Sequence, residues 1–171
     1  MKTLVTIAVI LSVTASLKAE PPKDTNSMAD CPMMKDHAAM DARGDKAMGF
    51  SQQKTTHHFR LAADGGSIEV STNDPDDQAS QAQIRSHMRH IAKMFEQGNF
   101  EIPMLVHQKM PDGAAIMQQE KSSISYTYEE TKAGAKVRIQ ANNPKAVKAV
   151  HEFLRFQIAE HRTGDSTEVG S

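Results

Sequence analysis

The sequence predicts an α+β fold in which a ββα unit is duplicated, giving a four-stranded antiparallel sheet with two main helices on one face. Two stretches, TTHHFRLAADGGSIEVSTNDP and SISYTYEETKAGAKVRIQANNP, each contain two alternating strands around a glycine-containing turn. A helical stretch follows each of them. Gly65 and Gly134 are 69 residues apart, and so are Pro75 and Pro144. The shared spacing favours duplication, with two unrelated hairpin–helix units as the alternative.

The tripeptides Asn-Asp-Pro and Asn-Asn-Pro predict where the two helices begin. Asp74 and Asn143 are residue types that cap helices, and Pro75 and Pro144 suit the first helical position. Apolar residues then recur at helical spacing, at Ile84, Met88, Ile91, Met94 and Phe95 in the first helix and at Val147, Val150, Leu154 and Ile158 in the second. Between the repeats, residues 101–107 look extended and residues 111–119 look like a short helix that begins at a proline.

The start of the chain predicts a signal peptide over residues 1–19. Lys2 precedes an apolar run from residue 4 to residue 13, and small residues follow. A membrane span needs about 20 apolar residues, so the run is too short to remain as an anchor. We therefore expect an exported mature protein, periplasmic or secreted, without a membrane anchor.

The rest of the chain divides by composition into an arm, one domain and a tail. Residues 20–54 are predicted to be a flexible arm rich in methionine and histidine. Residues 55–163 form the duplicated α+β domain, with the first repeat at 55–98, a connector at 99–121 and the second repeat at 122–163. Residues 164–171 are expected to be a disordered tail.

Charge and cysteine content narrow the range of partners. The chain has 20 basic and 21 acidic residues, and the leader contains Lys2 and Lys18 but no acidic residue. The mature chain then has 18 basic against 21 acidic residues, a net charge of −3, which argues against nucleic acid and anionic membranes as partners. Cys31 is the only cysteine, so an internal disulfide is impossible. The sequence does not indicate an oligomeric state.

The arm contains the stretch CPMMKDHAAM, which concentrates soft ligands among polar neighbours. Thiol and thioether sulfur select Cu(I), and imidazole binds both copper oxidation states. The candidate ligands in the arm are Cys31, Met33, Met34, His37 and Met40. Two other interpretations remain open. The arm is either a low-complexity linker with incidental methionines or an amphipathic helix that binds a partner through Met34, Met40 and Met48.

The domain carries a second set of candidate metal ligands, namely His57, His58, His87, His90 and His107. His57 shares a strand face with Phe59, whereas His58 points the other way. His87 and His90 form a His-x-x-His pair on the first helix. Each histidine alone is more typical of a half-buried residue bonded to a backbone carbonyl. The set indicates a metal site if three rings converge, since neutral imidazole is a common metal ligand.

Three functions follow from these observations. The first is an exported metal-binding protein, with copper as the expected metal. The second is a non-catalytic domain that binds a ligand or another exported protein and whose histidines are structural. The third is an enzyme with a histidine general base. The sequence lacks HExxH, Gly-x-Ser-x-Gly and a phosphate-binding loop, and adjacent Glu129 and Glu130 face opposite sides of a strand. Catalysis is therefore not favoured.

Three segments carry a resemblance to other proteins. The runs TTHHFRLAADGGSIEV, QIRSHMRHIAKMFEQGNFEIPMLVH and FLRFQIAEHRTGD resemble a group of small exported bacterial proteins, over residues 50–165. Members of that group sometimes carry an aspartate carbamoyltransferase label. This chain does not support the label, because it is too short for the two-domain transferase and lacks its Ser-Thr-Arg-Thr phosphate motif. The resemblance implies no catalytic residues. The arm separately resembles, in composition, the Met-rich segments of exported copper-handling proteins.

Overall fold

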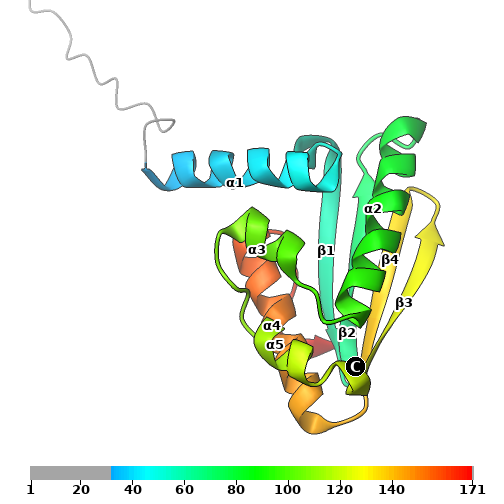
Figure 1. Cartoon of the computed structure of the whole chain (residues 1–171). Helices are drawn as coiled ribbons and strands as arrows, with labels where there is room; N and C mark the ends of the chain where they lie inside the picture. The colour runs from blue at the N-terminus through cyan, green and yellow to red at the C-terminus, as the bar shows by residue number, and fades with distance from the viewer. Residues whose placement is uncertain (1–31, 171) are drawn as a thin grey trace, which may run out of the picture.

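The computed structural model describes the backbone from residue 32 to residue 170 and the side chains from residue 36 onward. The predicted signal peptide lies outside this range. Five strands form one mixed sheet in the order β3-β4-β2-β1-β5 (Figure 1). The strands are β1 Thr55–Ala62, β2 Gly65–Thr72, β3 Ile124–Thr131, β4 Gly134–Ala141 and β5 Val169–Gly170.

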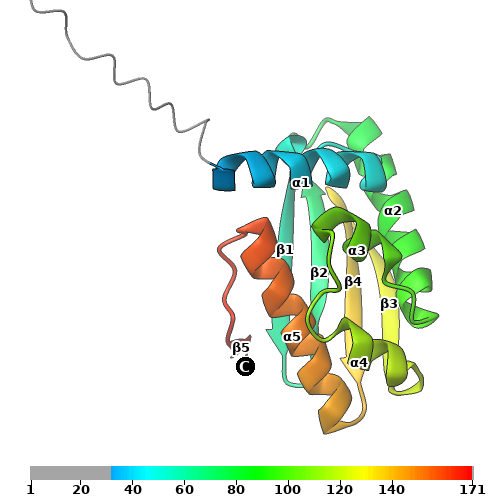
Figure 2. The ribbon, with the colours of Figure 1, turned by 60° about the vertical axis from the view of Figure 1, so that its left-hand side comes forward.

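All helices lie on one face of the sheet (Figure 2). They are α1 Pro32–Met48, α2 Gln78–Glu96, α3 Glu101–His107, α4 Ala114–Gln119 and α5 Pro144–His161, and short 3₁₀ turns occur at Gln52–Lys54 and Lys121–Ser123. Between residues 32 and 170, no helix is both long and apolar enough to cross a membrane. The predicted α+β fold is confirmed: two hairpin–helix units, β1β2-α2 and β3β4-α5, build the domain.

Strands β2 and β4 join the two units in an antiparallel pair. In its register Ile68 lies opposite Val137, the residue 69 positions later. The pair Gly65↔Gln140 likewise becomes Gly134↔Ser71 when each residue is replaced by its counterpart at this spacing. The two units are thus related by an approximate twofold axis through the middle of the sheet.

Side chains alternate along the strands and give the sheet one apolar and one polar face. The apolar face contributes Phe59, Ile68, Val70, Val137 and Ile139, which pack against apolar residues of α2 and α5. The other face carries charged pairs such as Arg60 with Glu69. The core therefore lies between the sheet and the helix layer, as the strand patterns predict.

The helix starts agree with the sequence in one unit and differ in the other. Asn143 caps α5 by accepting a hydrogen bond from the Ala146 amide at 2.8 Å, and Pro144 opens the helix. In the first unit the predicted cap Asp74 is wrong. Helix α2 begins at Gln78, and the Asp77 carboxylate accepts from the Ser80 amide at 3.0 Å and from the Ser80 hydroxyl at 2.7 Å. Asp77 lies three residues before Ser80, which is the spacing at which a capping side chain reaches a free backbone amide in the first turn. Asp74 lies too far before α2 to reach these amides.

Three other segments differ from the predictions. Residues 101–107 form the helix α3 rather than an extended segment, because Pro103, Val106 and His107 turn toward the core at helical spacing. The arm contains the helix α1, which packs against α3 and is tied to it by a hydrogen bond of 2.9 Å from Arg43 Nε to the Val106 carbonyl. The tail contains β5, which pairs in parallel with β1.

The tail is fastened to β1 by one carboxylate. Asp165 accepts a hydrogen bond from the Phe59 amide at 2.9 Å, and its other oxygen lies 2.9 Å from His58 Nδ1. These contacts hold the chain beyond α5 against the edge of the sheet. The residues after the Thr-Gly-Asp sequence therefore run along the edge of β1 and add the fifth strand opposite Leu61 and Ala62.

Two glycines with nearly equal backbone angles provide a stability test. Gly113 has φ of 76° and Gly164 has φ of 74°, a region that costs other residues about 1–2 kcal/mol. A Cβ on Gly113 would lie 2.1 Å from the Ala149 carbonyl oxygen of α5, whereas nothing lies within 4 Å of one on Gly164. We expect Gly113→Ala to lower the free energy of unfolding by about 1–3 kcal/mol more than Gly164→Ala, measured by urea unfolding followed by circular dichroism. Equal losses would contradict the close packing of the segment before α4 on α5.

Candidate functional site

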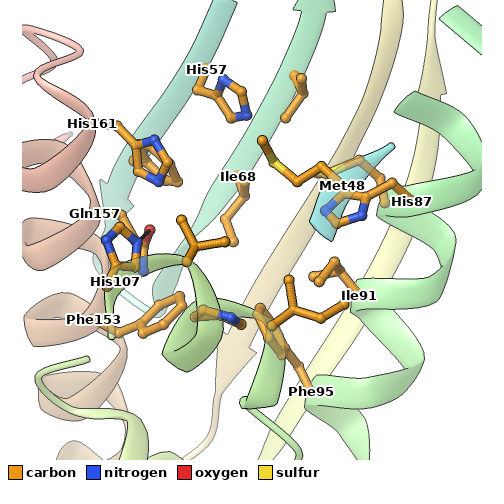
Figure 3. A pocket seen from close by; sticks show the side chains of 16 residues that line it. Met48, His57, Ile68, His87, Ile91, Phe95, His107, Phe153, Gln157 and His161 are labelled. Carbon is orange, nitrogen blue, oxygen red and sulfur yellow. Dashed lines mark hydrogen bonds between the residues drawn. The ribbon is translucent and has the colours of Figure 1, made fainter. Parts of the chain in front are cut away.

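A cavity of about 70 Å³ lies between the apolar face of the sheet and helices α2, α3 and α5. The end of α1 contributes Met48 to its wall (Figure 3). Apolar residues make up most of the lining. The exceptions are four histidines and one glutamine, namely His57, His87, His107, His161 and Gln157.

Each histidine reaches the cavity from a different element. His57 lies on β1, on the same face as Phe59, as the strand pattern predicts. His87 lies on the edge of α2, and His107 and His161 are the last residues of α3 and α5. Helix ends bring both of these rings over the same end of the core. In Figure 3, His57, His161 and His107 follow one another along one side of the cavity, with Met48 and His87 on the other.

Three of the rings form a continuous contact. The ring centres of His57 and His161 are 5.4 Å apart and the rings stack at 13°. The ring centres of His161 and His107 are 5.1 Å apart and the rings are nearly perpendicular. Phe50 covers the remaining gap, with its ring centre 5.5 Å from that of His87 and 6.2 Å from that of His57. The imidazoles are thus enclosed mainly by other rings.

His107 has polar neighbours on both sides of its ring. Its Nε2 lies 3.2 Å from Gln157 Oε1, and its Nδ1 lies 3.6 Å from Glu160 Oε2. The other oxygen of Glu160 accepts a hydrogen bond from Lys109 at 2.9 Å. The carboxylate therefore sits behind the His107 ring, away from Gln157.

Some polar atoms at the cavity are buried without a hydrogen-bond partner among the described residues. They are His57 Nε2, His107 Nδ1 and Gln157 Nε2. A buried polar atom that makes no hydrogen bond costs about 1–3 kcal/mol, so such atoms are rare in folded proteins. Their concentration at one cavity marks it as a place where a ligand could supply the missing interactions.

Burial keeps these histidines neutral. It lowers the pKa of His57 to about 4, with a smaller contribution from nearby His58. Burial likewise lowers the pKa of His87 to about 4 and that of His161 to about 3, and neighbouring histidines add to both effects. The pKa of His107 is also lowered, again mainly by burial. At neutral pH all four rings have a free nitrogen lone pair.

The rings do not point at a common atom. The His57 and His161 rings stack face to face, so their planes are nearly parallel. One ion therefore cannot lie in both ring planes. Within the described part of the chain, no group of three or more His, Cys, Asp or Glu side chains is arranged to hold a metal ion. In this conformation the cavity is a cluster of neutral imidazoles around an apolar space.

The structure brings together three of the five domain histidines that the sequence singled out. His57, His87 and His107 line the cavity, whereas His58 faces Asp165 on the polar side of the sheet. His90 is exposed on α2. The candidate ligands predicted from the sequence did not include His161, Gln157 or Met48. Of these, His161 could have been predicted, because it flanks the apolar stripe of the second helix.

Two arm candidates with described side chains, His37 and Met40, lie apart from this cavity. Met40 is buried, at 5% exposure, and His37 is half-buried on α1. The side chains of Cys31, Met33 and Met34 lie outside the described residues. Of the arm candidates whose side chains the structure describes, neither His37 nor Met40 lines the cavity, and the arm contributes Met48 to it.

Comparison of the chain with protein-family models, with curated proteins and with solved structures found no match. The cavity is therefore interpreted from its own chemistry. The resemblance to small exported bacterial proteins stays an expectation from the sequence.

The lowered pKa values predict a loss of stability in mild acid. The unfolded chain binds protons at its histidines below about pH 6.5, while folded His57 and His87 stay neutral to about pH 4. The histidine contribution is therefore complete above pH 6.5 and is lost as the pH falls toward 4. We expect the free energy of unfolding in urea to fall from pH 7 to pH 5, a range above most carboxyl titration.

Two variants separate this effect from general acid sensitivity. His57→Phe removes one of the titrating groups while keeping a ring, so the change between pH 7 and pH 5 should become smaller. His90→Gln, at an exposed position on α2, should leave the change as in the parent protein. An unchanged pH dependence in His57→Phe would show that the cluster does not control acid stability.

Proposed function

We propose that the protein is an exported metal-binding protein that binds copper at the histidine cluster of its cavity. One observation carries the proposal: four neutral imidazoles line one small cavity where two ring nitrogens have no hydrogen-bond partner among the described residues. Neutral imidazole is the form that binds metals. A bound ion would satisfy His57 Nε2, and Glu160, 3.6 Å from His107 Nδ1, would satisfy the other nitrogen.

The ring separations fit a shared ion. Bonds of about 2.0–2.1 Å from nitrogen to a tetrahedral metal place imidazole centres roughly 5 Å apart. The measured separations are 5.4 Å between His57 and His161 and 5.1 Å between His161 and His107. Binding requires one ring of the stacked pair to turn about its side-chain bonds. Such a rotation moves a nitrogen without moving the backbone.

An entry path for the ion exists on the outer side of the cluster. His57 and His161 also line a second, polar surface hollow, together with Asp41, Gln52 and Thr163. The two rings thus separate this hollow from the apolar cavity. An ion could exchange water for imidazole at this boundary without crossing the core.

Copper is favoured over zinc by the donor set. The lining contains no acidic residue, and Met48 contributes a thioether opposite the three-histidine row. Thioether sulfur selects Cu(I), while imidazole accepts copper and zinc alike. The proposal places the copper site in the domain, and the Cys31, Met33 and Met34 segment would at most pass the ion toward it.

One observation favours a second function. The stacking of His57 on His161 leaves no ready set of three ligands among the described residues, which suits a domain that binds a small organic molecule rather than a metal. His57 Nε2 and Gln157 Nε2 would then bond to that molecule. The histidines would act as neutral hydrogen-bonding groups.

Copper titration of the full-length protein tests the proposal. The titration uses Cu(I) without oxygen, in competition with a coloured chelator. We expect one equivalent to bind tightly, and we expect His57→Ala and His161→Ala each to weaken binding strongly. His90→Ala and His58→Ala, which alter histidines outside the cavity, should bind as the parent protein does. Equal binding by all variants would move the site to the arm, and no binding by the parent would leave the second function.

Glu160 provides a further prediction about the same site. A histidine that binds a metal usually donates its other ring N–H to a carboxylate or carbonyl, which fixes the tautomer. His107 Nε2 now faces Gln157 Oε1, an acceptor, and Glu160 Oε2 lies 3.6 Å from Nδ1. When the ion binds, the ring hydrogen would move to Nδ1 beside Glu160, and Nε2 would give up the Gln157 contact and face the ion. We expect Glu160→Gln to weaken copper binding about 10–100-fold in the same titration.

Lys109 supplies the matched control. It contacts the far oxygen of Glu160, at 2.9 Å, and its Nζ lies 4.8 Å from the ring centre of Phe156, so Lys109→Ala keeps the carboxylate behind His107. Its effect on copper affinity should be much smaller than that of Glu160→Gln. A larger effect of Lys109→Ala would show that charge at the surface, rather than the His107 tautomer, governs binding.

A further inference from the structure

The part of the cavity beneath the histidines is walled by aliphatic and aromatic side chains. The sheet contributes Ile68 and Val70, α2 contributes Ile91 and Phe95, α3 contributes Val106 and α5 contributes Phe153. Each of these residues is buried. A metal ion held by the histidines would occupy only the part of this space next to their rings. The apolar remainder therefore calls for a separate explanation.

We infer that this apolar space admits a small neutral molecule of diatomic size, such as carbon monoxide or dioxygen, beside the histidine cluster. The bond from that molecule to copper rests on the proposed function, whereas its entry into the cavity does not. The small molecule in this space would be the external ligand of the bound copper.

Size supports the inference. The cavity measures about 70 Å³, and one water molecule needs roughly 10–15 Å³ of such space. The space therefore holds a diatomic molecule with room to spare and is too small for a haem or a nucleotide. Its aromatic walls, Phe95 and Phe153, pack edge to face at 5.7 Å and limit further expansion.

Charge supports it as well. No lysine, arginine, aspartate or glutamate lines the cavity, and the four imidazoles are held neutral by burial. A charged ligand would lose its hydration without gaining a partner of opposite charge. A neutral diatomic loses little hydration, and space walled by aliphatic and aromatic side chains, as it is beneath the histidines, accepts small gases such as xenon.

Two measurements on the full-length protein test the inference. The first is xenon binding to the metal-free protein, followed by ¹²⁹Xe nuclear magnetic resonance. The second is carbon monoxide binding to the Cu(I)-loaded protein, followed by the infrared C–O stretching band. We expect a saturable xenon site and a single copper carbonyl band.

Variants that fill the space locate both signals. Val106→Phe and Ile102→Phe each add a ring from α3, at positions that line the cavity but carry no proposed ligand. Both should bind Cu(I) as the parent protein does and lose most of the xenon and carbonyl signals. Val147→Phe adds the same bulk on α5 beside a different surface hollow and should retain both signals. Two filling variants protect the test against one that fails to fold.

The outcomes separate the two proposals. Normal copper binding without a carbonyl band, or a band that survives both filling variants, overturns the inference and leaves the proposed function standing. If the protein binds no copper but has a xenon site that the filling variants abolish, the small-molecule cavity is supported and the proposed copper site is overturned. Absence of xenon binding in the parent protein overturns the inference whatever the copper result.

Discussion

The antiparallel pairing of β2 with β4 is the interaction on which the rest of the structure depends. Each hairpin–helix unit alone has a two-stranded sheet, which is marginally stable in water. The register that places Ile68 opposite Val137 joins the two apolar strand faces into one floor. Both main helices then bury their stripes against that floor. The cavity forms between that floor and helices α2, α3 and α5, with His57 of β1 in its wall.

Imidazoles fill that end of the core at a cost in solvation. Burial lowers the pKa values of His57 and His161 to about 4 and 3, so the fold keeps them uncharged. An aliphatic residue at either position would avoid this cost and would leave no unsatisfied nitrogen. A chain that retains imidazoles in such a place keeps them neutral, which is the form of histidine that can bind a metal.

The sequence predicted the elements of the repeat well because their signals are local. Strand alternation, the glycine turns and the Asn143 cap depend on a few adjacent residues, and the structure agrees with them. Helix α3 and strand β5 were missed because tertiary contacts decide them: His107 and Val106 pack inward on α3, and Asp165 fastens the tail. The site was found in part. The sequence predicted His57, His87 and His107 as candidate ligands. Their contact with His161 depends on where α3 and α5 end, which local sequence patterns do not specify.

The twofold relation of the units shows that the site is specific to one end of the sheet. At the spacing of 69 residues, the counterpart of His57 is Tyr126, and the counterparts of Gln157 and His161 are Met88 and Ala92. The Tyr126 hydroxyl is also buried without a hydrogen-bond partner among the described residues, but the ring of this partly buried residue packs against Phe95, with the ring centres 5.8 Å apart. Apolar side chains thus close one end of the core, and imidazoles line the other. Stability alone would allow the same solution at both ends, so a ligand at the histidine end, as proposed above, would account for the difference between Tyr126 and His57.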